Sequence, residues 1–104
     1  MNKKDYIAQV RVAVSQLHNC SATWHETVPI HEVFRGKKVW RGAVEVFDLH
    51  GHPKAKRAYA WGHLDGPNDE RIRFVAVLEI PPVVSAEIAV QVHIAKNMKQ
   101  QKPQ

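Results

Sequence analysis

The stretch from Val39 to Trp61 constrains the fold more than any other part of the chain. It consists of an extended segment rich in Val and Phe, a loop with the sequence HGHPK, and a second extended segment that alternates Ala with Tyr and Trp. β-Branched and aromatic residues pack well on a pleated sheet. Gly51 and Pro53 are typical of a turn, because Gly tolerates a positive φ and Pro cannot donate to a β-ladder. The stretch therefore predicts a long β-hairpin.

Alternation of side chains gives this hairpin two different faces. We expect Leu49 to lie opposite Ala55 across a five-residue loop, which places Val46 opposite Ala58. One face is then small and apolar and suits helix packing, whereas the other face is aromatic and charged. A shift of the register by one residue would change which side chains share a face.

The N-terminal third supplies a helix and a further strand. Apolar residues recur at helical spacing from about Lys4 to His18 and predict an amphipathic helix. Residues 24–35 have the pattern of a strand. Pro29 lies inside this strand and has no N–H group, so it indicates a position at the edge of the sheet.

The C-terminal third supplies the last strand and a segment with two interpretations. Residues 71–80 alternate cleanly, and we expect Leu64 to pair with Ile72. Residues 86–99 have the length of a helix and follow Ser85, which suits an N-cap. Their β-branched residues would also suit a fifth strand. We favour the helix, because the length and the cap agree.

Together these elements predict a single α+β domain over residues 1–104, with residues 99–104 as a frayed basic tail. The element order is α-β-β-β-β-α. We expect the strands to form a four-stranded antiparallel meander, with the N- and C-terminal helices packed on one face. The other face of the sheet would then be open.

Charge and composition restrict the class of protein only partly. The net charge of +5 and the pI near 9.6 permit binding to nucleic acid, to an anionic membrane or to an acidic protein, but they require none of these. No apolar run approaches the roughly 20 residues needed to span a bilayer, and the start lacks a secretory signal pattern. The single cysteine, Cys20, cannot form an internal disulfide. We therefore expect a cytoplasmic protein that is not bound to a membrane.

The expected open face gathers aromatic, aliphatic and arginine side chains. They are Phe47, Leu49, Arg57, Tyr59, Trp61, Arg73, Val75 and Val77. Monomers rarely expose so large an apolar patch, and Tyr, Trp, Phe and Arg are enriched at interfaces. We therefore predict an interface here, with an identical chain as the most common kind of partner. The alternative is that the C-terminal segment covers this face.

The hairpin loop is the second candidate site. Its polar residues are Asp48, His50, His52, Lys54 and Lys56. An acid–base role for them would require a pocket and shifted pKa values, which the sequence does not establish. A Zn site needs three or four ligands, and no second His or Cys pair has metal-binding spacing. We expect solvated histidines, with no catalytic residue, no metal and no cofactor.

One part of the hairpin resembles a known group of proteins. The segments VEVFDL (residues 44–49), GHPKAKR (51–57) and YAW (59–61) resemble a hairpin shared by short bacterial proteins with no assigned activity. The likeness extends to VAVLEIPP (75–82) and covers about half of the chain. The resemblance implies a bacterial origin and implies no catalytic residue.

The sequence leaves three functions open. The first, which we favour, is a non-enzymatic binding or interaction protein that forms a homodimer through the open face. The second is a single-stranded nucleic-acid binder in which Phe47, Tyr59 and Trp61 stack on bases and arginines contact phosphates. The third is a small-molecule binder or an enzyme, with a pocket near the loop at residues 48–57.

Overall fold

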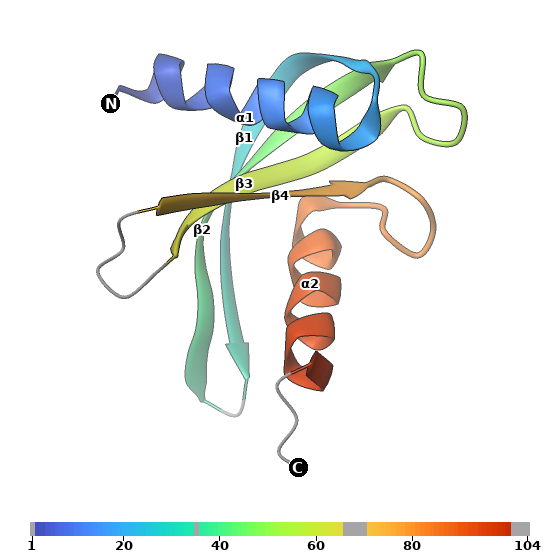
Figure 1. Cartoon of the computed structure of the whole chain (residues 1–104). Helices are drawn as coiled ribbons and strands as arrows, with labels where there is room; N and C mark the ends of the chain where they lie inside the picture. Colours follow the sequence, from blue (N-terminus) through green and yellow to red (C-terminus); the bar gives the residue numbers. More distant parts are fainter. Residues whose placement is uncertain (1, 35, 66–70, 101–104) are drawn as a thin grey trace.

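The computed structural model describes residues 2–34, 36–65 and 71–100. The elements in order are α1 (Lys3–His18), β1 (Ser21–Phe34), β2 (Lys37–His50), β3 (Arg57–Asp65), β4 (Arg71–Leu78) and α2 (Ala86–Gln100). The strands form one antiparallel sheet in the order β1-β2-β3-β4 (Figure 1). The predicted α+β class, element order and meander are therefore confirmed. Residues 99 and 100 belong to α2, and the rest of the expected frayed tail lies outside the described residues.

Both helices begin at side-chain caps. The Asn2 side chain accepts a hydrogen bond from the backbone N–H of Asp5 at 2.8 Å, at the start of α1. At the start of α2, the Ser85 hydroxyl accepts one from the N–H of Ile88 at 3.2 Å. These bonds satisfy N–H groups that have no partner within the helix. The cap predicted at Ser85 is confirmed, and residues 86–99 are helical rather than a fifth strand.

The two hairpin registers differ in how well the sequence predicts them. The β3–β4 register is as expected, with Leu64 paired with Ile72. The β2–β3 register is shifted by one residue, because Val46 pairs with Tyr59 and not with Ala58. The cause lies in the turn, where His52 Nδ1 accepts hydrogen bonds from two backbone N–H groups at 3.0 Å each. The turn thereby takes in one residue more than the expected five.

Helices α1 and α2 pack on opposite faces of the β3–β4 hairpin. Ala58 and Ala60 face α1, whereas Tyr59 and Trp61 face α2. The α1 core consists of Val10, Val14, Ala22, Phe47, Leu49, Ala55, Ala58 and Ala60. The α2 core consists of Val44, Val46, Tyr59, Trp61, Val83, Ala86, Ala89 and Val90. Figure 1 shows α1 above β4 and α2 below it, so our expectation that both helices share one face needs this correction.

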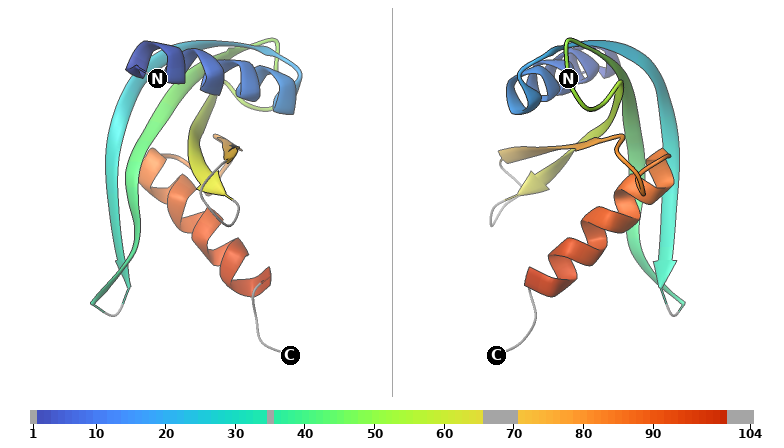
Figure 2. Two further views of the ribbon diagram at one scale, coloured as in Figure 1. Left: turned by 60° about the vertical axis from the view of Figure 1, so that its left-hand side comes forward. Right: turned by 90° about the vertical axis from the view of Figure 1, so that its right-hand side faces the viewer.

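The sheet forks between β2 and β3. These strands pair only from Glu45–Asp48 to Arg57–Ala60. Beyond this point β2 continues with β1 as a two-stranded arm, and β3 continues with β4 (Figure 2). At the fork, the backbone N–H of Gly62 donates to the Tyr6 hydroxyl at 2.8 Å instead of to β2. Helix α1 therefore closes the fork with a side chain.

A bulge at His25 changes the alternation of β1. Trp24 pairs with Phe47, but the next pair is Glu26 with Val46, so one residue of β1 is extra. Before the bulge, Ala22 packs in the α1 core. After the bulge, even-numbered residues such as Val28 lie on the α2 side. The bulge therefore brings Glu26 and the aliphatic residues that follow it onto one face.

Candidate binding pocket

The eight residues of the predicted interface do not form an exposed face. Phe47 is completely buried in the α1 core, and Trp61 is 1% exposed in the α2 core. Leu49 and Tyr59 are buried on opposite faces, and Val75 and Val77 pack against the α2 core. Only Arg57 and Arg73 of the set retain polar groups near the surface. The expected open face is therefore wrong, because the β2–β3 register and the position of α2 differ from those we assumed.

Trp61 belongs to an aromatic cluster inside the α2 core. Its ring makes edge contacts with Trp40 and with His93, with centroid separations of 5.5 Å and 5.3 Å. Burial lowers the pKa of His93, and the neighbouring charges of His63 and Lys96 lower it further. A buried indole cannot stack on a base, so the nucleic-acid hypothesis loses its expected stacking residues.

Three of the polar residues of the hairpin loop, Asp48, His50 and His52, have structural partners. Asp48 accepts two hydrogen bonds from the Arg57 guanidinium, at 3.2 and 3.1 Å. His50 Nε2 lies 3.0 Å from the Thr23 hydroxyl, and His52 holds the turn. Lys54 and Lys56 are exposed. Across residues 2–34, 36–65 and 71–100, no three His, Cys, Asp or Glu side chains are arranged to hold a metal.

A buried carboxylate beside the fork was not singled out by the sequence. Glu45 is 2% exposed, and its Oε1 accepts hydrogen bonds from Trp24 Nε1 at 3.0 Å and from the Thr27 hydroxyl at 2.5 Å. Burial raises the pKa of Tyr6, the hydrogen bond from Gly62 opposes that change, and the charge of Glu45 adds to it. Two donors compensate for burying the carboxylate, so its arrangement is that of a structural group.

A pocket of about 430 Å³ lies on the α2 side of the sheet. It is formed where β1 and the start of α2 face each other across β2 and β3. The lining residues are Glu26, Val28, Pro29, Ile30, Val46, Arg57, Tyr59, Val84, Ser85, Ala86 and Glu87. Glu26, Val46 and Tyr59 are consecutive partners across three strands, so they form one row of the floor. The lining residues thus come from β1 near the N-terminus, from β2 and β3, and from the start of α2 near the C-terminus.

Two hydrogen-bonded pairs fix the polar end of this pocket. The Tyr59 hydroxyl donates to Glu79, and burial together with this bond raises the pKa of Tyr59 to about 12. The Arg57 guanidinium is held by Asp48. Burial opposes its charge, but Asp48 and then Glu79 raise the pKa of Arg57 overall. Near neutral pH, Tyr59 is therefore neutral and Arg57 is charged and paired.

The remaining charged groups of the lining are carboxylates. Glu26 comes from β1 and Glu87 from the first turn of α2. Both are exposed, and His25 Nε2 lies 3.7 Å from Glu26 Oε2. Between them the lining is aliphatic, with Val46 at the floor and Val84 60% exposed at the rim. The site therefore combines an apolar surface with two exposed carboxylates, one of which lies near His25.

Sequence reasoning located only part of this pocket. The third hypothesis placed a pocket near residues 48–57, and Arg57 does line it. Glu26 and Glu87 were not predicted as site residues. The acidic first turn of α2 was visible in the sequence, but no pattern reveals the bulge at His25 that turns Glu26 toward α2.

Comparisons with known proteins identify no relative of this chain. No helix in the described ranges is long and apolar enough to cross a membrane. Searches against protein-family models, curated proteins and solved structures find no match to this chain. The pocket is therefore interpreted from its own geometry and charge.

Proposed function

We propose that the protein is a non-enzymatic binding protein, active in the cytoplasm, whose ligand is a small amphipathic cation such as an alkylamine. One observation carries this proposal: the pocket between β1 and α2 offers two exposed carboxylates, Glu26 and Glu87, beside an aliphatic floor. A primary amine would donate hydrogen bonds to the carboxylates, and its hydrocarbon chain would cover Val28, Ile30 and Val46.

The charge balance of the pocket supports a cation rather than an anion. The chain carries a net charge of +5, whereas the pocket contains Glu26 and Glu87 together with an Arg57 that is paired with Asp48. A third carboxylate, Glu79, accepts a hydrogen bond from the Tyr59 hydroxyl. An anionic ligand would meet these carboxylates at close range, which costs free energy in a partly desolvated site.

The state of the titratable groups favours binding over catalysis. A general base must be unprotonated and free to accept a proton near the working pH. With a pKa of about 12, Tyr59 is protonated near neutrality and already donates to Glu79. Arg57 is committed to Asp48. These groups shape the pocket and do not offer an acid–base pair.

A titration with three ligands of the same hydrocarbon length tests this proposal. Hexylamine, hexanol and hexanoate each contain six carbon atoms, and near neutral pH their head groups are positive, neutral and negative. We expect hexylamine to bind most tightly, and to shift the backbone amide resonances of Val28, Val46 and Ala86. Equal affinity for the three ligands, or tighter binding of hexanoate, would contradict the proposal.

Variants that replace a carboxylate by a neutral amide test whether Glu26 and Glu87 bind the amine. Glu87→Gln should weaken hexylamine binding about two- to fivefold, since a partly exposed ion pair contributes up to about 1 kcal/mol. Asp5→Asn is the matched control, because Asp5 occupies the first turn of the other helix, outside the pocket lining. An unchanged affinity in both Glu87→Gln and Glu26→Gln would show that the amine binds elsewhere.

A further inference from the structure

The β1–β2 hairpin extends beyond the fork of the sheet as a two-stranded arm. Its pairs run from Val28 with Val44 to Phe34 with Lys37, and in this stretch β2 does not pair with β3. We call residues 28–34 and 37–44 the arm. At about 3.3 Å per residue the arm is roughly 20 Å long, and it extends away from α1 (Figure 2). An arm of two strands has two faces, and α2 lies on one side of it.

The face of the arm toward α2 is covered. Val28 and Ile30 pack against the α2 core. The Glu32 carboxylate accepts a hydrogen bond from the side-chain amide of Gln91 in α2 at 2.9 Å. Glu32 is the only carboxylate in residues 28–44 of the sequence. The negative charge of the arm is therefore on the covered face and has a partner there.

The opposite face, which we call the outer face, consists of Pro29, His31, Arg41 and Ala43. Pro29 pairs with Ala43, and His31 pairs with Arg41, so these side chains lie on the same side of the two strands. All four residues are exposed. They line a shallow hollow of about 590 Å³, and its other lining residues, Ile30 and Gly42, also belong to the arm. Among the described residues, none from either helix lines this hollow.

Positive charge is concentrated in the arm. Residues 28–44 contain four Lys and Arg residues and one carboxylate, whereas the rest of the chain contains 11 and nine. The turn at the tip has the sequence RGKK. Within the described ranges, the Arg41 guanidinium forms no ion pair. The next carboxylate along the outer face, Glu45, is 2% exposed and already accepts two hydrogen bonds. The arm therefore presents exposed cations without an exposed carboxylate between them.

The shape of the outer face favours a double helix over a protein or a single strand. The major groove of DNA is about 12 Å wide and admits a two-stranded β-ribbon. Protein interfaces are usually anchored by large aromatic residues, and single strands stack on aromatic rings. The outer face contains no Phe, Tyr or Trp. Because Pro29 and Ala43 are small, His31 and Arg41 are its longest side chains and would reach furthest into a groove.

We infer that the arm binds double-stranded DNA, with its outer face in the major groove. Arg41 and His31 donate hydrogen bonds to acceptor atoms at the edges of the bases, and the basic sequence at the tip attracts the phosphates. The covering of the other face by α2 holds the ribbon in one orientation. This inference does not rest on the proposed amine site, because Glu26 and Glu87 are not part of the outer face.

Four fluorescent polyanions test this inference with the full-length protein. They are a short DNA duplex, an RNA duplex of the same sequence, one of the DNA strands alone, and poly-glutamate. The RNA duplex has the same charge, but its major groove is too narrow for side chains to read. We expect the DNA duplex to bind most tightly, more weakly as salt is added, and to shift the amide resonances of His31 and Arg41. Equal binding of any other polyanion, or resonance shifts confined to residues outside the arm, would overturn the inference.

Matched substitutions separate the arm from net charge. Arg41→Gln should weaken binding of the DNA duplex about fivefold or more, because it removes a donor from the groove. Arg11→Gln is the control, since Arg11 is exposed on α1 and the substitution changes the net charge equally.

A second pair of substitutions adds a negative charge at exposed alanines. Ala43→Glu on the outer face should weaken binding about tenfold or more, and Ala8→Glu on α1 should weaken it far less. Equal effects within either pair would show that the arm is not the DNA-binding surface.

Discussion

At the scale of single residues, the position of Trp61 decides between two accounts of the sheet. If the aromatic face were open, Trp61→Glu would leave the monomer folded. In the structure Trp61 is 1% exposed and contacts Trp40 and His93 inside the α2 core. Replacing a buried Trp by a smaller residue costs about 3–5 kcal/mol, and a buried unpaired carboxylate costs more.

We therefore expect Trp61→Glu to lower the free energy of unfolding by more than about 3 kcal/mol. Urea denaturation followed by circular dichroism measures this change. Leu17→Glu, on the exposed side of α1, serves as the control and should unfold close to the wild-type urea concentration. A Trp61→Glu variant as stable as the control would mean that Trp61 is not a core residue.

The hydroxyl of Tyr59 gives a prediction about pH. Its pKa rises from 10.0 in the unfolded chain to about 12 in the fold, because of burial and the bond to Glu79. The neutral form is thus favoured by folding, so this contribution to stability is present below pH 10 and is lost as the pH rises toward 12. Glu79→Gln should lower the pKa of Tyr59, since it removes a nearby negative charge.

Ultraviolet absorbance of tyrosinate follows this titration directly. The chain has two tyrosines, and Tyr59→Phe identifies which of the two phases belongs to Tyr59. In Glu79→Gln the Tyr59 phase should move to lower pH while remaining above the phase of a model tyrosine, because the burial is retained. An unmoved phase would show that Glu79 does not act on this hydroxyl.

At the scale of elements, the sequence predicts those features whose signals are local. Ser85 and the helical length of residues 86–99 identify α2 and its start. The β3–β4 register follows because Gly62 leaves room for its cross-strand partner: an added Cβ there would lie 3.1 Å from the Phe74 ring. Pro29 correctly indicates that β1 is an edge strand.

The β2–β3 register depends on interactions that alternation does not encode. A one-residue change in the turn follows from the two hydrogen bonds that His52 accepts, and these require the folded loop. The extra residue at His25 has no composition signal either. Because every face assignment on β1 and β3 follows from these two features, the predicted interface residues and the observed pocket residues share only Arg57 and Tyr59.

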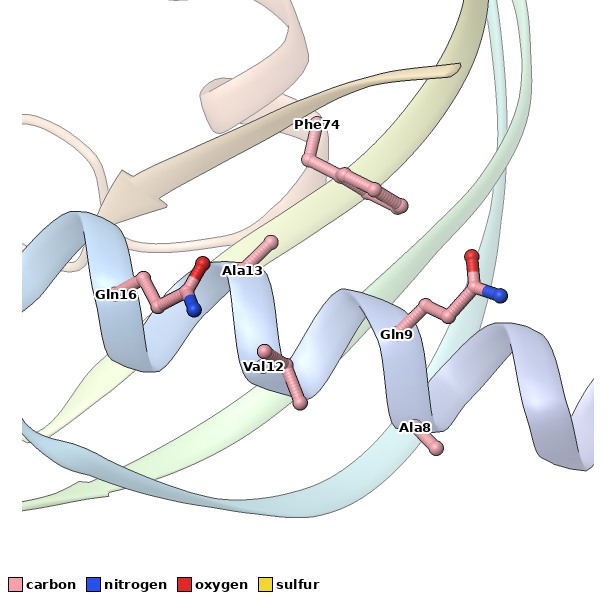
Figure 3. A pocket seen from close by; sticks show the side chains of 6 residues that line it. All are labelled: Ala8, Gln9, Val12, Ala13, Gln16 and Phe74. Carbon is pink, nitrogen blue, oxygen red and sulfur yellow. The ribbon is translucent and has the colours of Figure 1, made fainter. Parts of the chain in front are cut away.

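At the scale of the whole molecule, alternation along β3 explains why both faces of the β3–β4 hairpin are covered. Small Ala58 and Ala60 allow α1 to lie close to the strand, whereas Tyr59 and Trp61 on the other side provide the bulk against which α2 packs. The sheet therefore separates two surfaces. The amine pocket is on the α2 side, and a second recess, lined by α1 and Phe74, is on the α1 side (Figure 3).

This separation predicts that a change on the α1 side leaves the amine pocket unaffected. The pocket and the α1-side recess share no lining residue, and no element contributes lining side chains to both. Coupling would require a change on one side of the sheet to shift an equilibrium on the other side. We therefore expect Val12→Asp, a substitution at a partly exposed position of α1, to bind hexylamine with the affinity of the wild-type protein. Isothermal titration of both proteins measures this, and a reproducible difference in affinity would show that the two sides of the sheet are coupled.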